Sequence, residues 1–189
     1  MNVPKVDIKQ LLEAGVHLGH KTLRWNPKMK KYIFGEKNSI HIIDLTQTVD
    51  FLKNALVEVH KVISSGGKLL IVSTKKQASE QVSDLAKETG ASIVFGPKAE
   101  ASFDFYQAYD GETFKVGGIQ IKALHTPGHT LESTCYLLLD EQKKEYCIFT
   151  GDTLFIGDVG RPDLAVKSDL SQADLAKLLH QSLKEKKNV

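Results

Sequence analysis

Residues 68–96, KLLIVSTKKQASEQVSDLAKETGASIVFG, decide how the chain folds, because they predict a strand, a helix and a second strand in one run. Leu69–Val72 is an apolar run typical of a strand, and Ile93–Phe95 supplies the second strand. Between them, apolar residues at helical spacing follow a capping box and end at Gly90. Such a unit crosses over between strands of a helix-covered sheet, and its functional loop follows the first strand. We therefore expect an α/β fold with a functional loop at Ser73–Gln77.

The composition is that of an ordinary folded protein. The 189 residues are 41% hydrophobic and 25% charged. No apolar run approaches the ~18 residues that span a bilayer, and the N-terminus lacks the apolar core of a secretory signal. We therefore expect a cytoplasmic protein without membrane contact. Cys135 and Cys147 lie on the two arms of a predicted hairpin, and we expect free thiols in a reducing compartment.

Charge is distributed unevenly along the chain. Residues 1–90 carry 14 Lys and Arg against 9 Asp and Glu, whereas residues 91–189 carry 11 against 14. A basic half suits a polyanionic partner, and an acidic half does not. A surplus of this size can also serve only to solvate a surface, but its concentration in one stretch favours a binding role.

That stretch spans residues 21–37 and holds six basic residues against a single acidic one, interleaved with Trp25, Tyr32 and Phe34. Basic side chains reach phosphate oxygens and planar groups stack on bases, so the pattern is typical of an RNA-binding surface. An exposed basic loop that its aromatic residues anchor to the core explains the composition equally well. The candidate RNA-binding residues are Lys21, Arg24, Trp25, Lys28, Lys30 and Lys31.

The flanking segments predict the start of an α/β sheet domain. Apolar spacing indicates a short helix over residues 8–14, a strand at Ile40–Asp44 and a long helix from Leu45 to the Gly66–Gly67 stop. Residues 15–38 fit neither a helix nor a strand. Four histidines lack the spacing of a metal site, and we expect them to cap or hydrogen-bond within the fold. They are His17, His20, His41 and His60.

The strings AGVHLGH, RWNPKM and IHIIDL carry a family resemblance. With them, residues 1–87 resemble the N-terminal part of the bacterial small-subunit ribosomal protein two family. The resemblance implies a Rossmann- or flavodoxin-like half-sheet, assembly into the small ribosomal subunit, and contact with its ribosomal RNA and ribosomal proteins. It also favours the RNA-binding interpretation of residues 21–37. The later segments of that family, including a helical hairpin insertion and further strands, do not follow in this chain.

From Ala91 onward the sequence changes to short strands and turns, with hairpins predicted over residues 114–124 and 133–149. The segments HTPGHT and FTGDTLFIGDVGRPD place His129 before the second hairpin and Asp152 after it. One strand out and one strand back return the chain to the same edge, so we expect these two side chains to converge. An imidazole and a carboxylate at one edge are a metal-ligand pair. Each residue alone is more simply explained as an ordinary turn residue.

HTPGHT, TGDTLF and GDVGRPDLA are also the strings that carry a second resemblance. Over residues 85–180 the chain resembles the metallo-β-lactamase superfamily, in particular its glyoxalase-II-like and persulfide dioxygenase branch. The resemblance implies the β-rich half of an αββα sandwich, with His129 and Asp152 as metal ligands. It places Arg161 and Asp163 near the substrate end of the site. His125 occupies a position that the family often keeps without using it as a ligand.

The chain departs from that family where its first metal ligands should lie. The family supplies them from an HxHxDH loop between a strand and a helix, and this chain has Ser73–Gln77 there, with two lysines. A C-terminal histidine ligand is also absent, and we do not expect His180 to replace it. A catalytic metal needs about three protein ligands, and two remain. We therefore expect no catalytic residues and no cofactor, with iron or zinc only if other ligands complete the site.

The sequence thus predicts a composite chain, with a ribosomal-protein-like segment at residues 1–90 and a metallo-β-lactamase-like segment at residues 91–189. Engineering, gene recombination and a mis-assembled reading frame all explain such a chain. The leading function is an rRNA-binding constituent of the small subunit. The alternative is a metalloenzyme acting on a small thiol-derived substrate, a thioester or glutathione persulfide. A third interpretation is that neither activity survives.

Overall fold

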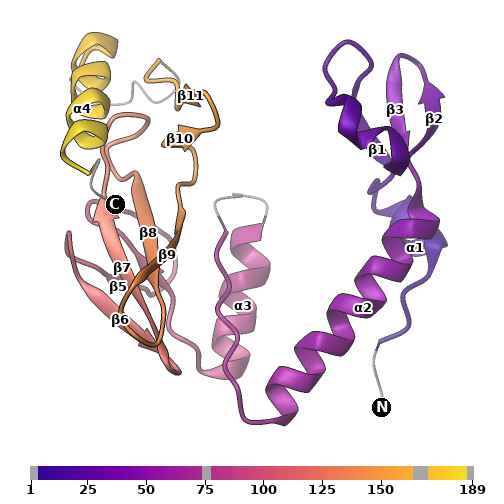
Figure 1. Cartoon of the computed structure of the whole chain (residues 1–189), viewed down its shortest axis with the longest axis horizontal. Coiled ribbons are helices and arrows are strands. Elements are labelled where there is room, and N and C mark those ends of the chain that lie inside the picture. The colour runs from indigo at the N-terminus through magenta and orange to yellow at the C-terminus, as the bar shows by residue number, and fades with distance from the viewer. Residues whose placement is uncertain (1–3, 74–77, 164–169, 187–189) are drawn as a thin grey trace. The chain divides into compact units, whose positions relative to one another are not determined.

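The computed structural model describes residues 4–73, 78–163 and 170–186, and the chain divides into two compact units, Met1–Leu69 and Leu70–Val189 (Figure 1). The division falls at the start of the 68–96 segment, whereas the sequence placed the domain boundary at residue 90. In the described residues no helix is both long enough and apolar enough to span a bilayer.

The N-terminal unit is a small sheet followed by a long helix. Its three strands are antiparallel in the order β1-β3-β2. Its elements are α1 (Ile8–Glu13), β1 (Leu18–Lys21), a 3-10 helix η1 (Pro27–Tyr32), β2 (Ile33–Lys37), β3 (Ile40–Ile43) and α2 (Leu45–Ser64).

This unit confirms the expected helices and corrects the expected sheet. Asp44 caps α2 by accepting a hydrogen bond from the backbone N–H of Thr46 at 3.0 Å, and the chain leaves the helix through Gly66 at φ +79°. Residues 15–38 were expected to be irregular, but they include β1 and β2. Pairing with β3 on both sides forms these strands, because tertiary partners override weak local propensity. A parallel Rossmann-like half-sheet is not formed among the described residues of this unit.

The C-terminal unit is built on a four-stranded antiparallel sheet in the order β6-β7-β8-β9. Both predicted hairpins are present, and α3 ends at the predicted Gly90, which has φ +68°. The elements are α3 (Ser79–Thr89), β4 (Val94–Phe95), β5 (Tyr106–Gln107), β6 (Thr113–Val116), β7 (Ile119–His125), β8 (Thr134–Leu139), β9 (Glu145–Phe149), β10 (Leu154–Phe155), β11 (Asp158–Val159) and α4 (Gln172–Glu185). The α/β class is therefore confirmed by the mixed helix and strand content.

The predicted strand–helix–strand unit is formed only in part. Leu69–Val72 is not a strand, and its four apolar side chains are between 39% and 52% exposed. β4 pairs in parallel with β5 instead, so no crossover joins it to the earlier segment. A run of strand-forming residues becomes a strand only when a partner completes its backbone hydrogen bonds. Of the expected functional loop Ser73–Gln77, residues 74–77 lie outside the described residues.

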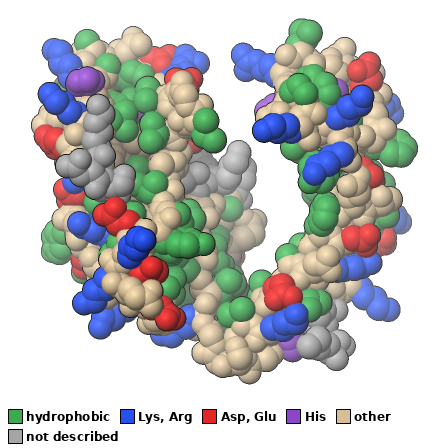
Figure 2. All heavy atoms as spheres, viewed as in Figure 1, with side chains coloured by type: hydrophobic (Ala, Val, Ile, Leu, Met, Phe, Trp, Pro, Cys, Tyr) green, Lys and Arg blue, Asp and Glu red, His purple; other side chains and the backbone are tan. Residues whose placement is uncertain are grey.

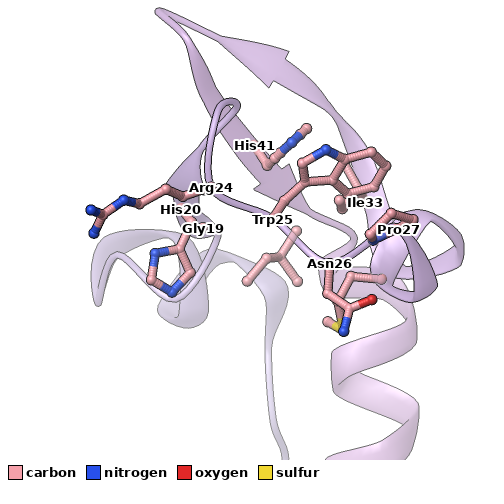
Figure 3. A pocket seen from close by; sticks show the side chains of 10 residues that line it. Gly19, His20, Arg24, Trp25, Asn26, Pro27, Ile33 and His41 are labelled. Atoms are coloured by element: carbon pink, nitrogen blue, oxygen red, sulfur yellow. The ribbon is translucent and has the colours of Figure 1, made fainter. Parts of the chain in front are cut away.

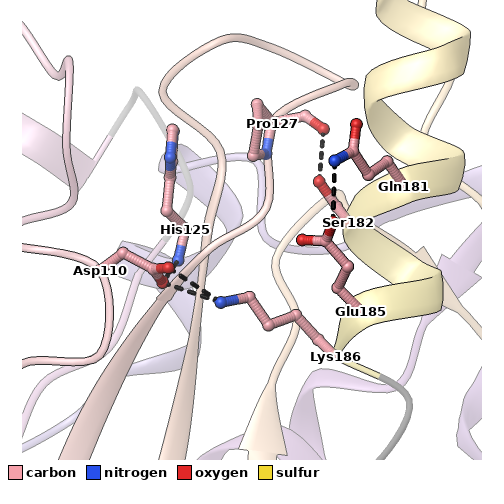
Figure 4. A network of polar contacts seen from close by, with 7 residues as sticks. All are labelled: Asp110, His125, Pro127, Gln181, Ser182, Glu185 and Lys186. Carbon is pink, nitrogen blue, oxygen red and sulfur yellow. Dashed lines mark hydrogen bonds and ion pairs between the residues drawn. The ribbon is translucent and has the colours of Figure 1, made fainter.

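The core of the C-terminal unit fixes the loop that follows β7. Leu124, Cys135 and Leu137 form a buried cluster within the sheet. From α4, the Ser182 hydroxyl donates to the Pro127 carbonyl at 2.9 Å (Figure 4). A Cβ atom on Gly128 would lie within 2.4 Å of backbone atoms of Leu179, so only glycine allows this approach. The HTPGHT loop is therefore held against α4.

A second contact closes the same helix onto the sheet. The Lys186 ammonium donates to the Asp110 carboxylate at 2.9 Å, and the backbone N–H of His125 donates to the same carboxylate at 2.8 Å (Figure 4). Partial burial acts to raise the pKa of Asp110, but these hydrogen bonds outweigh it and lower the pKa below its ordinary value. Asp110 thus joins the end of β7 to the C-terminal end of α4.

Candidate functional site

The six candidate RNA-binding residues all lie on the surface of the N-terminal unit, on one continuous segment. Lys21 ends β1, Arg24 and Trp25 lie in the following turn, and three lysines lie on η1. Asn26 begins η1 because its side chain accepts the N–H of Lys28 at 3.0 Å and Pro27 follows it. Figure 2 shows basic side chains over the sheet end of this unit. Whether these residues contact RNA stays a prediction.

Beside this segment the unit has a hollow of about 660 Å³ (Figure 3). Its wall includes the indole of Trp25, which is 41% exposed and whose ring lies 4.9 Å from that of His41 between centroids. The hollow therefore has an aromatic wall, and Arg24 is the basic residue of its lining apart from two histidines. The lining residues are Gly19, His20, Arg24, Trp25, Asn26, Pro27, Met29, Ile33, His41 and Ile43.

His41 is a residue that the sequence assigned to hydrogen bonding within the fold. Its Nε2 atom is buried, and within the described residues it has no hydrogen-bond partner. Leaving a buried polar atom unpaired costs about 1–3 kcal/mol, which makes the atom a candidate for a ligand contact. The IHIIDL string placed His41 on a strand, but only the structure places it beside Trp25 in the hollow.

In the C-terminal unit, His129 and Asp152 converge as the sequence predicted. The Nε2 atom of His129 lies 4.0 Å from a carboxylate oxygen of Asp152. The strands β8 and β9 run out and back between them, which returns residue 152 to the edge that residue 129 leaves. Below the pair, the buried hydroxyls of Thr126 and Thr153 lie 3.2 Å apart and join the two loops.

The imidazole of His129 is oriented by a carbonyl group from a distant part of the chain. Its Nδ1 lies 2.8 Å from the backbone carbonyl oxygen of Arg161, so Nδ1 carries a proton that it donates to this oxygen, and Nε2 is the ring nitrogen nearest Asp152. Gly160 permits this contact, since a Cβ atom there would lie 2.9 Å from the imidazole. This is the arrangement that a metal-binding histidine requires.

Arg161 and Asp163, the residues expected near a substrate end, pair with each other. The guanidinium of Arg161 donates two hydrogen bonds to the Asp163 carboxylate. This contact lowers the pKa of Asp163 and raises the pKa of Arg161. Substrate binding by this pair stays a prediction. His125 does not join His129 and Asp152. Its Nε2 lies 2.8 Å from the carbonyl oxygen of Leu131 instead.

The donor set at His129 and Asp152 does not fit a catalytic metal within the described residues. Among them, no group of three His, Cys, Asp or Glu side chains could hold a metal ion. A catalytic zinc or iron takes about three protein ligands and keeps one open position, so two donors are too few. The lysines expected to replace the missing loop, Lys75 and Lys76, lie outside the described residues.

Comparison with known proteins identifies the N-terminal part first. The family model described as ribosomal protein S2 matches residues 11–96. The small ribosomal subunit protein uS2 of Sinorhizobium medicae is 57% identical over 89 residues, which is 47% of this chain and 35% of that protein. The uS2 protein of Zymomonas mobilis is 35% identical over 175 residues, which is 88% of this chain and 70% of that protein.

The chain belongs to the ribosomal protein S2 family. It spans about a third of the length of the rhizobial relatives, with 35% covered in the Sinorhizobium medicae protein. The predicted resemblance of the N-terminal half is confirmed.

Matches among solved structures concern the C-terminal part. A metallo-beta-lactamase from Staphylococcus aureus is 30% identical with a TM-score of 0.47, and the match covers 57% of this chain and 33% of that one. ETHE1 from Myxococcus xanthus is 31% identical with a TM-score of 0.42, over 58% of this chain and 41% of that one. These names agree with the second resemblance that the sequence carries.

Proposed function

We propose that the chain is an rRNA-binding, ribosomal-protein-like constituent of the small ribosomal subunit, fused to a metallo-hydrolase-like part with an incomplete metal site. The supporting observation is the exposed basic segment, in a chain that belongs to the ribosomal protein S2 family. Six of its residues present cationic or aromatic groups within one short surface stretch. His129 and Asp152 of the C-terminal unit are not part of this stretch.

The chemistry of this surface suits folded RNA. Lysine and arginine side chains neutralise phosphates and release counterions, and this term supplies most of the sequence-independent affinity. Family membership supports ribosomal RNA and ribosomal proteins as the partners, and the cytoplasm as the location, because that is where small subunits assemble.

The test is binding to small-subunit rRNA over a series of salt concentrations. Replacing Lys28, Lys30 and Lys31 with Gln removes three cations, so we expect weaker binding and a shallower salt dependence. The slope of log K against log salt concentration should become less negative by about 0.7–0.9 for each phosphate that is no longer neutralised. The matched control removes the same charge from the C-terminal unit, at the exposed residues Lys115, Lys143 and Lys144. Binding that is independent of salt, or equal in both triple variants, contradicts the proposal.

A metal-dependent enzyme is the second candidate, because His129 and Asp152 converge and the tautomer of His129 is fixed. The substrate class, a thioester or a glutathione persulfide, rests on the sequence resemblance alone. The two donors, His129 and Asp152, do not by themselves fit a catalytic metal within the described residues. The test is the metal content of protein purified without chelators. About one iron or zinc per chain, absent from His129→Ala, supports this candidate, and metal-free protein rules it out.

A further inference from the structure

We propose that the hollow beside Trp25 binds one unpaired nucleobase of RNA, which stacks on the indole while Arg24 and the lysines that neighbour it along the chain hold the flanking phosphates. The inference rests on the proposed RNA-binding function and goes beyond it, because it assigns a base-binding site. It also commits to single-stranded or bulged RNA, since a base inside a continuous duplex is not free to enter a pocket.

The hollow is large enough to admit a nucleobase, and its lining suits a flat ring. Ligand pockets are commonly about 300–1,000 Å³, and the hollow of about 660 Å³ lies within that range. Pro27, Met29 and Ile33 give it an apolar lining that a flat ring can cover without leaving polar atoms unpaired. The aromatic wall adds a stacking partner, and stacking is tolerant of base identity because every base has a π-face.

Trp25 combines anchoring with exposure. Its ring is packed near His41, with an interplanar angle of 47°, and yet 41% of the residue is exposed. Figure 3 shows the indole beside the imidazole at the edge of the hollow. An aromatic residue that serves only to pin a loop to its core buries its ring. Partial exposure of an anchored indole is the arrangement that a stacking platform needs, because little side-chain entropy is lost on binding.

Polar and charged groups of the same hollow supply the other contacts. The buried Nε2 of His41 lacks a hydrogen-bond partner in the described part of the chain, and the edge of a base offers both donors and acceptors. Arg24 lines the hollow, and Lys21 and Lys28 lie three and four residues from it along the chain. This charge favours a polyanion over a neutral ligand. An acidic peptide shares the charge but lacks a base to stack, so the test includes it.

The readout follows from the sequence, because Trp25 is the only tryptophan in the chain. Stacking of a base on its indole quenches fluorescence from this one site. The probes are RNA hairpins that carry a single bulged nucleotide, one for each of the four bases, and the same hairpin fully paired. With the whole chain, we expect quenching and tighter binding for bulged hairpins, and little quenching for the paired one.

Variants separate stacking from charge. Trp25→Ala should weaken binding of bulged RNA about five- to 150-fold and weaken binding of the paired hairpin by clearly less, as measured with labelled RNA. Trp25→Phe, which keeps an aromatic ring against His41, should recover part of the affinity. Phe155→Ala is the matched control, because Phe155 is 49% exposed on β10 of the C-terminal unit and does not line the hollow. It should change neither affinity.

The outcomes distinguish failure of this inference from failure of the proposed function. Equal binding of bulged and paired RNA without quenching overturns the base site and leaves RNA binding intact. Absence of binding to these hairpins and to small-subunit rRNA overturns both. Quenching by an acidic peptide and not by bulged RNA assigns the hollow to a protein partner and also overturns the inference.

Discussion

The two units of the chain differ in how many side chains they bury and in which functional groups they display. Among the described residues of the N-terminal unit, Leu45 and Val49 are the buried hydrophobic side chains, and its basic and aromatic groups are displayed on the surface. The C-terminal unit buries a cluster of side chains within its sheet, but among the residues that the structure describes, His129 and Asp152 are too few donors for a catalytic metal. The comparison teaches that a well-packed core and a complete functional surface are separate properties, which can occur in different halves of one chain.

The largest effect that this comparison predicts is in the core of the C-terminal unit. Leu124 is 3% exposed and packs with Cys135 and Leu137, so Leu124→Ala should lower the free energy of unfolding by about 2–5 kcal/mol. Chemical denaturation followed by circular dichroism measures it. Ile156→Ala is the control, because Ile156 is fully exposed, and it should change the free energy by less than about 0.5 kcal/mol.

The same variant tests whether the two units are independent. The only tryptophan, Trp25, lies in the N-terminal unit, so its fluorescence follows the unfolding of that unit alone. Leu124→Ala should therefore leave the fluorescence transition where it is in the unmodified chain. A fluorescence transition that moves together with the circular dichroism transition would show that the units fold as one, and the comparison would fail.

A smaller effect is expected from the matching substitution in the N-terminal unit. Leu45 is 6% exposed, but its helix also carries apolar residues that face solvent, such as Phe51 and Ile63. Because Val49 is the only other buried hydrophobic side chain among the described residues of this unit, the site can collapse more easily around a truncated side chain, and Leu45→Ala should cost about 2 kcal/mol, the lower end of the usual range. Urea titration followed by Trp25 fluorescence measures it. A cost as large as that of Leu124→Ala would remove the contrast between the two cores.

Two segments that the sequence predicts as strands show how far the fold could be predicted from sequence alone. Ile121–Leu124 lies in β7, with β6 on one side and β8 on the other, and Ile121 is 5% exposed. Leu69–Val72 is the more aliphatic of the two segments, but it pairs with no strand among the described residues and stays exposed. Apolar periodicity predicts which segments can form strands, and hairpins follow because their partners are adjacent. It does not reveal whether a distant partner is present.

The candidate sites divide in the same way. The convergence of His129 and Asp152 was predictable, because a single hairpin separates them and returns the chain to one edge. The contact between His129 and the Arg161 carbonyl joins residues 32 positions apart, and Arg161 lies in the irregular chain after β11, where no periodic signal exists. The Nε2 of His41, which has no hydrogen-bond partner in the part of the chain that the structure describes, was equally hidden, because its surroundings depend on how Trp25 packs against β3.

The smallest predicted effect is a pH dependence confined to the C-terminal unit. The folded-state pKa of Asp110 lies below its ordinary value of 3.8, because the hydrogen bonds from Lys186 and from the His125 N–H outweigh partial burial. A carboxylate with a lowered pKa contributes stability that is fully present above its unfolded pKa and is lost as the pH falls through the folded pKa. Because the Asp110 side chain is 49% exposed, solvent screens the pair and the loss should stay below about 1 kcal/mol.

Asp110→Asn isolates this contribution, since the amide keeps an acceptor for the His125 N–H but has no charge to titrate. We expect the variant to be slightly less stable than the unmodified chain at pH 6 and closer to it at pH 3, as measured by denaturation of the C-terminal unit. The Trp25 fluorescence transition should show no difference between the two proteins at either pH. Equal stability gaps at both pH values would mean that the Lys186 contact fixes the position of α4 without contributing through its charge, and that the unit owes its stability to packing alone.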